Sequence, residues 1–382
     1  MSSAVGHRAG GPLTWRAKDT SLDEVLTRLS ELMAKCSRSS MGTDSTLRAH
    51  TSILNLLVLV PTLAAAKEVE TTLEKMGSAH PSRTIILVVK PKAQMLALDA
   101  EVGCFADTSA RSQFHDQVTL VLHGELALHP DSVVRPLLLS DLPVILWEPF
   151  DTEVTRSSST VLRGLARRHL VDAARSEHWQ QRLVQLDALA QGDRPSVVIG
   201  DFSWGRTSNW RDAIAGLFDA EYARRHLDHV SQIAIAYESA TAAGPVCALL
   251  LAGWLMSSLG WTVGGRTVCQ EGGQILTFEA GAGRMVTIHP ERRKQPPGEL
   301  LEVRLKATGG ASSASFAVVR DGRDPQCAQA ICQVGSSWRL AHTLEMMARD
   351  NADLLSSELQ ELAPDHAFAS SLAAVGQILR SI

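Results

Sequence analysis

Hydroxyl side chains gather in the stretch EPFDTEVTRSSSTVLRG, residues 148–164, directly after a predicted strand. Ligands of open α/β sheets bind at the carboxyl ends of the strands, and hydroxyls beside the N–H groups of a helix N-terminus suit a phosphate. Ser157, Ser158 and Thr160 are therefore candidate phosphate ligands. The same run also begins an ordinary helix, and no acid–base pair stands nearby. Helix capping is the preferred interpretation.

Two cysteines and two histidines are the other candidates for chemistry. Cys327 and Cys332 form a C-x4-C pattern on a predicted strand, where an odd separation puts the two thiols on opposite faces and keeps them from pairing. They are either small half-buried apolar residues, the preferred interpretation, or thiols that sense the redox state. His226 and His229 have no partner at a ligand spacing, which predicts surface histidines and no metal site.

Nucleotide and nucleophile motifs are missing from the sequence. GAGR, residues 281–284, lies between two short predicted strands and no helix follows it, so it predicts a hairpin turn rather than a dinucleotide-binding loop. No Walker loop and no G-x-S-x-G pattern occur. We therefore expect no cofactor and find no catalytic set.

Length and composition set the class of protein. A chain of 382 residues with 45% apolar and 20% charged residues fits a globular protein of two domains. A net charge of -4 provides no basic field for nucleic acid or for an anionic membrane. The N-terminal segment lacks the apolar core of a secretory signal, and the six cysteines are too scattered for a secreted disulfide framework. We expect a cytoplasmic protein.

The N-terminal half alternates strands and helices. Residues 1–20 are rich in Gly, Ala and polar side chains and are expected to be mobile, and Ser21 and Glu24 form a capping box for the helix that follows. The alternation predicts right-handed crossovers and a largely parallel sheet with flanking helices. Its strands are predicted at 56–61, 84–90, 117–122, 143–149 and 196–200, and its helices at 63–76, around 155–168 and at 177–191.

The C-terminal half has a different pattern. A strand at 229–239 and an almost wholly apolar helix at 245–259 are followed by short strands with Gly or Pro turns, which predict an antiparallel meander. Two helices, about 345–362 and 366–380, close the chain. The predicted fold class is α/β plus α+β. The predicted divisions are a mobile N-terminus with a capped helix (1–45), an α/β domain (46–222) and an α+β domain (223–382).

The stretch GDFSWGRTSNWRDAIAGLFD, residues 200–219, joins the two halves. Trp204 and Trp210 flank a turn in which Thr207 or Ser208 is a plausible N-cap for the next helix. We expect this stretch to end one domain and to open the other.

Three motifs in this order resemble the glucose-6-phosphate dehydrogenase assembly protein family, OpcA: SVVRPLLLSDLPVILWEP (132–149), the stretch 200–219, and ALLLAGWLMSSLGW (248–261). RAHTSILNLLVLV (48–60) is similar to the family's first strand, and the C-terminal segment resembles the longer cyanobacterial type. Asp212 stands where the family usually has Glu, and residues 270–340 match weakly. The residues that match the middle motif are Asp201, Trp204, Arg206, Thr207, Trp210, Arg211, Leu217, Phe218 and Asp219.

The resemblance implies a non-enzymatic protein that binds glucose-6-phosphate dehydrogenase, promotes its active oligomer and activates it allosterically in the oxidative pentose phosphate pathway. Trp and Arg are common interface anchors, so Trp204, Arg206, Trp210 and Arg211, with Asp201, are candidates for binding the partner or, by the slightly preferred interpretation, for packing between the domains. The resemblance also implies thiol-dependent control, with a thioredoxin as a candidate second partner and Cys327 and Cys332 as candidate thiols. The alternatives are a sugar-phosphate-binding protein or enzyme that uses the 148–164 loop, and a purely structural scaffold.

Overall fold

The fold divides into two compact units that are not continuous in sequence. Unit 1 comprises Met1–Asp172, Ser196–Gly200 and Asn351–Ala363, and unit 2 comprises Ala173–Pro195, Asp201–Asp350 and Pro364–Ile382. The computed structural model describes residues 13–39, 52–106, 114–192, 197–241, 243–264, 267–270, 275–281, 283–292, 299–309 and 312–382. The expected fold class, α/β plus α+β, is confirmed, because the first sheet is mostly parallel and the second is mostly antiparallel. The predicted division at residues 222 and 223 stays a prediction.

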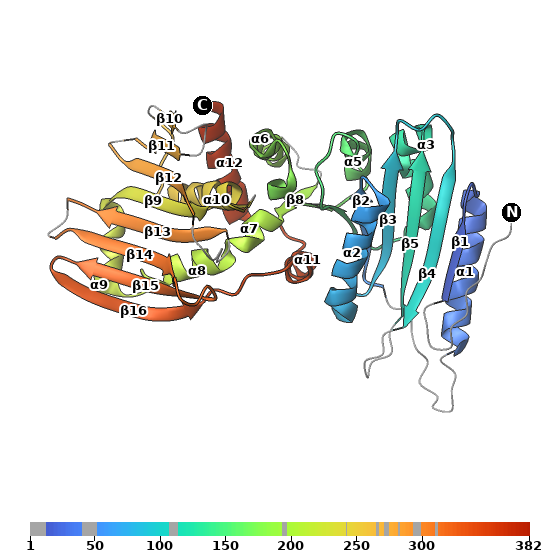
Figure 1. Ribbon diagram of the computed structural model, residues 1–382, viewed down its shortest axis with the longest axis horizontal. Helices are drawn as coiled ribbons and strands as arrows, with labels where there is room; N and C mark the ends of the chain where they lie inside the picture. Colours follow the sequence, from blue (N-terminus) through green and yellow to red (C-terminus); the bar gives the residue numbers. More distant parts are fainter. Residues whose placement is uncertain are drawn as a thin grey trace. The chain divides into compact units, whose positions relative to one another are not determined.

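Unit 1 is built on an eight-stranded sheet in the order β1-β4-β5-β3-β2-β6-β7-β8 (Figure 1). The run β5-β3-β2-β6-β7 is parallel throughout, as predicted. The long apolar runs arise because strands covered on both faces bury every side chain, as all of β2 does. The strands are β1 Leu13–Ala17, β2 Leu54–Val60, β3 Ser82–Lys90, β4 Leu98–Ala106, β5 Phe114–His123, β6 Val144–Glu148, β7 Arg168–Val171 and β8 Val198–Asp201.

Strands β1 and β4 extend this sheet and were missed in the sequence. Both are antiparallel to their neighbours, so neither belongs to the strand–helix alternation that revealed the others. The expectation of a mobile N-terminus is wrong for Leu13–Ala17, whose backbone pairs with β4, while residues 1–12 lie outside the described residues. The predicted helix at 155–168 ends earlier, at Arg163, because the backbone from Arg168 onward pairs with β6.

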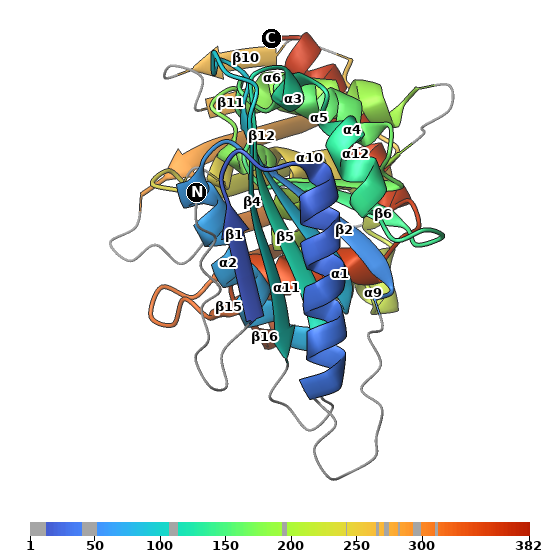
Figure 2. The same cartoon turned by 90° about the vertical axis from the view of Figure 1, so that its right-hand side faces the viewer.

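Helices cover both faces of the unit 1 sheet. Helix α1 contacts β1 and β4, α2 contacts β2 and β3, and the two lie on opposite sides of the sheet (Figure 2). The Ser21 hydroxyl caps α1 by accepting from the Glu24 N–H at 3.2 Å, while the Glu24 carboxylate accepts from the Thr20 hydroxyl at 2.9 Å. The helices are α1 Leu22–Ser39, α2 Leu63–Met76, α3 Glu125–Leu128, α4 Pro130–Val134, α5 Arg156–Arg163 and α11 Asn351–Gln360.

Helix α11 returns from the C-terminal part of the chain to unit 1, where it contacts α2. Buried Arg168 of β7 forms an ion pair with Glu358 of α11 and donates to the Ala363 carbonyl at 3.1 Å. The predicted helix at 345–362 begins only at Asn351, because residues up to Glu345 pair with β15.

Unit 2 contains a second eight-stranded sheet, in the order β10-β11-β12-β9-β13-β14-β15-β16. Its strands form two antiparallel ladders, but β9 inserts between β12 and β13 and runs parallel to β12, so the predicted single meander is wrong at that point. The strands are β9 Val230–Glu238, β10 Thr267–Gln270, β11 Ile275–Glu279, β12 Met285–Glu291, β13 Leu300–Ala307, β14 Ala314–Arg320, β15 Cys327–Val334 and β16 Ser337–Glu345.

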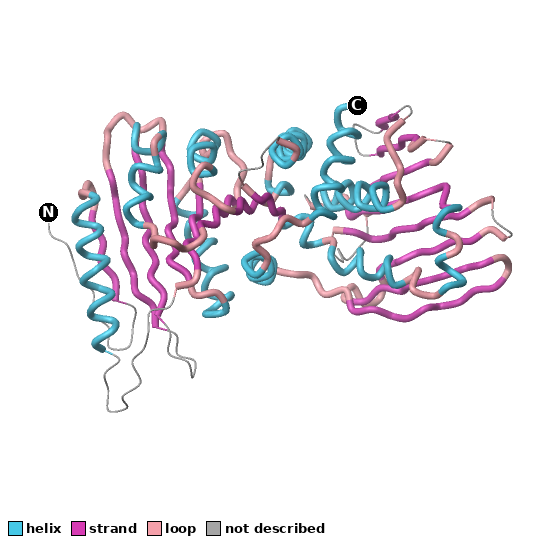
Figure 3. The backbone as a smooth tube through the Cα atoms, turned by 180° about the vertical axis from the view of Figure 1, so that it is seen from behind, coloured by secondary structure: helices cyan, strands magenta, loops and turns pink. Residues whose placement is uncertain are grey.

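Helices α8 and α10 of unit 2 lie along one face of its sheet. They stand behind the strands in Figure 1 and in front of them in Figure 3, which views the protein from the opposite side. Helix α10 contacts β9, β12 and β13, and α8 contacts β14. The helices are α6 Trp179–Ala190, α7 Phe202–Arg206, α8 Ser208–Gly216, α9 Glu221–Arg224, α10 Gly244–Ser258 and α12 His366–Arg380.

The apolar helix α10 is the centre of this unit, as its composition predicts. It packs between the sheet and α12, which leaves nearly all of its side chains buried. Gly253 permits the approach of α12, because a Cβ atom there would lie 2.5 Å from the Ser371 carbonyl oxygen. The Ser371 hydroxyl donates to the Leu250 carbonyl at 2.6 Å and fixes the same contact.

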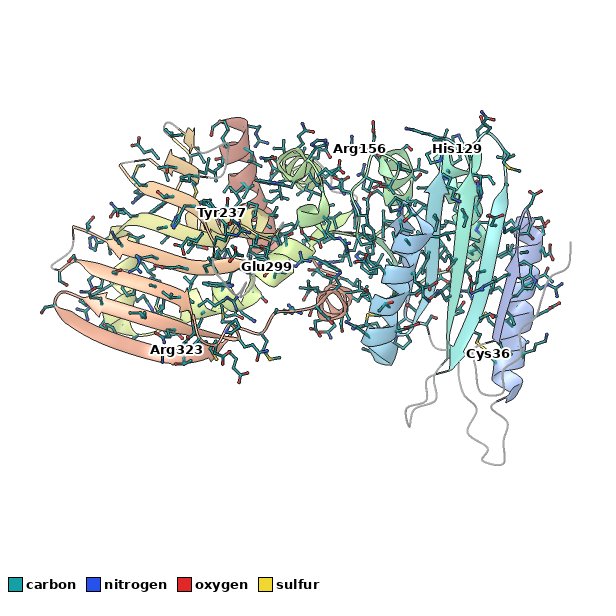
Figure 4. All side chains as sticks on the ribbon, viewed as in Figure 1. Cys36, His129, Arg156, Tyr237, Glu299 and Arg323 are labelled. Atoms are coloured by element: carbon teal, nitrogen blue, oxygen red, sulfur yellow. A yellow bond between two sulfur atoms is a disulfide. The ribbon has the colours of Figure 1, made fainter. Side chains whose placement is uncertain are left out.

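A disulfide joins Cys36, near the end of α1, to Cys104 on β4 (Figure 4). Both side chains are buried, and 68 positions separate them in the sequence. The bond therefore closes a long loop and ties α1 to the antiparallel extension of the sheet. Composition argued against a disulfide framework and contained no signal for this single pair.

We expect Gly253→Ala to lower the free energy of unfolding by about 1–3 kcal/mol, because the added methyl overpacks the contact between α10 and α12. Gly216→Ala is the matched control on a neighbouring helix, where the nearest atom to an added Cβ is 4.0 Å away. Chemical denaturation of both variants measures the effect, and equal stabilities would contradict this packing.

Cys36→Ser is expected to destabilise unit 1 by about 2–4 kcal/mol under oxidising conditions, because the unfolded chain regains the freedom of the long loop. Thermal unfolding with and without dithiothreitol measures the effect. The reductant should lower the melting temperature of the unmodified chain and leave that of Cys36→Ser unchanged. A shift of the same size in both proteins would show that the disulfide does not contribute.

Candidate partner-binding site

The stretch 200–219 forms the connection from β8 through α7 to α8. Asp201, the last residue of β8, caps α7, because its carboxylate accepts from the Ser203 N–H at 2.7 Å. Thr207 occupies the N-cap position of α8, as expected, but the expected side-chain hydrogen bond to the helix does not form. Thr207 already has helical backbone angles, so its hydroxyl points back and donates to the Trp204 carbonyl at 2.8 Å.

Trp204 is 3% exposed and contacts the start of helix α12. Its indole N–H donates to one carboxylate oxygen of Asp365 at 2.7 Å, and the ring lies 5.5 Å from that of Phe368. The other oxygen of Asp365 accepts from the Phe368 N–H at 2.9 Å and caps α12. One carboxylate thus holds both the indole and the first turn of α12.

Arg211 covers the outer face of the same tryptophan. Its guanidinium lies 3.5 Å from the Trp204 ring centroid, a distance at which the cation is attracted to the ring electrons. Arg211 is half-buried, whereas the indole beneath it is buried. The part of this cluster nearest to solvent is therefore the charged one.

Trp210, on α8, is 2% exposed and lies 5.5 Å from the Arg320 guanidinium. Arg320 donates to the carbonyls of Leu300 and Met346, both at 3.1 Å, so the ring sits where α8 meets the sheet. Phe218 continues this contact, with its ring 4.6 Å from that of Phe316. Both tryptophans therefore contact residues of unit 2 itself.

Arg206 is the remaining predicted residue, at the end of α7. Its guanidinium lies 3.9 Å from the Glu299 carboxylate, and its side chain is 13% exposed (Figure 4 labels Glu299). The structure thus brings Trp204 and Arg211 together, uses Asp201 to cap α7 and leaves Arg206 in a separate charged contact. Their predicted role in partner binding stays a prediction.

The Ser/Thr loop lies in unit 1, at the carboxyl ends of β6 and β7. Its buried hydroxyls are directed inward: Ser158 donates to the Ala127 carbonyl at 2.6 Å, and Ser159 donates to the Glu148 carboxylate at 2.8 Å. The exposed Thr160 hydroxyl donates to the Arg156 carbonyl, and Ser157 is exposed. This geometry favours a helix start over a phosphate site.

Glu148 also contacts a buried histidine that sequence reasoning missed. The His169 Nε2 atom lies 3.1 Å from the carboxylate, and both residues are at most 1% exposed. In the sequence, the only indication of this pair is that each residue lies in a strand of the parallel sheet. Because neither is accessible, the cluster can stabilise the interior of unit 1 but cannot reach a substrate.

The two predicted thiols differ in their surroundings. The Cys327 thiol donates to the Asp324 carboxylate at 3.3 Å, and this hydrogen bond raises the pKa of the thiol above its ordinary value. Cys332 is buried, and neither cysteine forms a disulfide, as their positions on opposite faces of β15 predict. A raised pKa lowers the thiolate fraction, so Cys327 is not activated as a nucleophile.

The other expectations concern metals and membranes. His226 is buried rather than at the surface, since its ring packs 6.1 Å from that of Phe316, and burial lowers the pKa of its imidazole. Within the ranges that the structure describes, no three His, Cys, Asp or Glu side chains form a metal-binding group. No helix of the described part is both long and apolar enough to cross a membrane.

Comparison with solved structures finds distant likenesses. KijD10 with bound NADP, a 3-ketoreductase from Actinomadura kijaniata, has a TM-score of 0.43 at 8% identity over 86% of this chain and 96% of that chain. The WlbA dehydrogenase of Bordetella pertussis has a TM-score of 0.41 at 9% identity over 87% and 96%.

Sequence comparison identifies the family. A family described as the glucose-6-phosphate dehydrogenase subunit matches residues 74–191 with its N-terminal domain and residues 197–372 with its C-terminal domain. A Nostoc punctiforme protein, provisionally named OxPP cycle protein OpcA, is 23% identical over 94% of this chain and 75% of its own length. A Synechocystis protein with the same provisional name is 30% identical over 34% of this chain and 26% of its length. The chain therefore belongs to the glucose-6-phosphate dehydrogenase assembly protein family, OpcA.

Proposed function

We propose that this protein is a non-enzymatic assembly factor and allosteric activator of glucose-6-phosphate dehydrogenase, acting in the cytoplasm to support the oxidative pentose phosphate pathway. Family membership supports the partner. The observation that carries the proposal is the cluster of Trp204, Asp365 and Arg211. Residues of the family motif are used there to hold helices of unit 2 together, which suits a rigid binding surface better than a catalytic pocket.

A bound protein activates an enzyme only if its affinities for the two conformations of the enzyme differ. The chain raises the substrate affinity of the dehydrogenase only if it binds the competent conformation more tightly than the other. A coupling of about 1–3 kcal/mol corresponds to a roughly 5- to 150-fold change in affinity. A rigid surface favours such coupling, because little conformational entropy is lost when it binds.

Arg206 and Arg211 are the proposed contacts with the enzyme. Both are half-buried, so part of each residue remains accessible, and Arg206 lies against Glu299 as Arg211 lies against the Trp204 ring. A guanidinium ordered in this way loses little side-chain entropy in an interface, which is one reason why arginine often dominates binding energy. Trp204 supports Arg211 from the interior.

In a dehydrogenase assay at limiting glucose 6-phosphate, the unmodified chain should raise the rate, and the chain alone should show no turnover. Arg206→Ala should weaken activation roughly tenfold, as expected for an interface anchor, without changing the melting temperature. Arg323→Ala is the control, because this exposed residue of unit 2 lies in the turn before β15 (Figure 4). Unchanged activation by Arg206→Ala and Arg211→Ala would remove both anchors. Saturable binding of glucose 6-phosphate that Ser157→Ala abolishes would favour the sugar-phosphate alternative.

Thiol-dependent control is proposed as well, with a thioredoxin-type dithiol as the second partner. Among the described residues, the Cys36–Cys104 disulfide is a group that this reductant can reduce, whereas Cys327 and Cys332 are thiols and become its targets only after a cellular oxidant such as a peroxide has oxidised them. Activation measured with and without the reductant should respond in the unmodified chain. Loss of the response in Cys36→Ser assigns control to the disulfide, and loss in Cys327→Ser/Cys332→Ser assigns it to the thiols. A response retained in both variants would contradict control by either pair.

A further inference from the structure

One face of the unit 2 sheet carries no helix among the described residues (Figures 1 and 3). Along β13 its side chains alternate with buried ones, such as Val303 and Leu305, that face the helices. On β9 and β14 the small side chains of Ala236 and Ala317 are buried on this face as well. Strand pairing places one row of residues straight across this surface, which we call the open face. The row runs through Thr277, Thr287, Ala234, Arg304, Ala317 and Ile331.

The side chains in the middle of the open face protrude little from the sheet. Most of the central row has short side chains, and Thr287, Ala234 and Ile331 are half-buried although no helix covers them. Short side chains let a second sheet approach to about 10 Å, the usual spacing of packed sheets. Antiparallel sheets with one solvated face usually carry polar residues along it, so this row departs from that pattern.

A hollow of about 300 Å³ lies on the same face, beside the central row. Gln232, Ala234, Thr287 and Lys306 contribute to its lining, and Met285 stands at its edge with 36% of its surface exposed. A flat surface that offers both a protruding apolar side chain and a hollow can fit a copy of itself.

The charges of the open face are also self-complementary. Lys306 and Glu302 point to this face from the same strand, four residues and about 13 Å apart. Glu302 accepts from the Arg304 Nε at 2.7 Å, and Lys306 is exposed. A twofold axis that runs along the central row exchanges the two ends of the strand, so that Lys306 of one copy faces Glu302 of the other. Such an isologous pairing requires both signs on one patch.

The area is sufficient for a stable contact. Eight strands of about seven residues form a face of roughly 38 by 23 Å, or about 870 Å². A standard interface buries about 800 Å² on each partner. We propose that the open face binds a second copy of this chain, sheet against sheet across a twofold axis. This inference does not depend on the proposed function.

Sedimentation equilibrium of the full chain tests the proposal, with an expected mass of twice 41.2 kDa. Ala234→Arg places a bulky charge in the central row and should raise the dissociation constant of the dimer at least tenfold. Ala215→Arg is the matched control, because Ala215 is exposed on α8, on the helix side of the sheet. Melting temperatures close to that of the unmodified chain would show that each variant folds.

Charge-reversal variants provide a second test of the dimer, which does not depend on side-chain packing. Lys306→Glu and Glu302→Lys should each weaken the dimer, and the double variant should recover part of the affinity by restoring opposite charges across the axis. A monomeric unmodified chain at micromolar concentration, or a dimer that Ala234→Arg leaves intact, would overturn the proposal. So would a monomer whose binding to the dehydrogenase is lost in Ala234→Arg, since the open face would then serve the enzyme.

Discussion

The hydrogen bond between the Trp204 indole and the Asp365 carboxylate is the contact on which unit 2 depends most. A buried indole N–H needs an acceptor, and a helix N-terminus favours a negative side chain. One carboxylate meets both needs and so connects α7 to α12. Because α12 packs on α10 and α10 packs on the sheet, this pairing links the family motif to the whole core of the unit.

The helices that pack on one face of the unit 2 sheet leave the opposite face outside the core. With α8 and α10 placed against the inner face, every second residue of the strands is directed away from the core. That outer surface is broad and almost flat, and it carries charges of both signs. The motif residues Trp204 and Trp210 support the helices of this unit from the interior.

In unit 1, buried charged side chains are paired with other groups of the fold. Arg83 and Asp116 stand opposite each other on neighbouring parallel strands and form a buried ion pair, and Arg83 also donates to the Leu137 carbonyl at 3.0 Å. Glu148 is likewise surrounded by hydroxyls and His169. Each charge is satisfied within the fold, which removes groups that resemble catalytic residues from any contact with solvent.

Local pattern was enough to determine much of this protein. The strands β2, β3 and β6, the helix Leu63–Met76 and the buried helix α10 follow from apolar periodicity and from Gly and Pro positions, which act within a few residues. The family followed from tryptophans at fixed offsets. Only the tertiary structure decided that β9 inserts beside β12, that α11 returns to unit 1 and that Cys36 meets Cys104, because pairing between distant segments depends on the whole set of competing contacts. For the same reason, the sequence identified Trp204 as a residue of the family motif, but only the tertiary structure decided that its ring is buried.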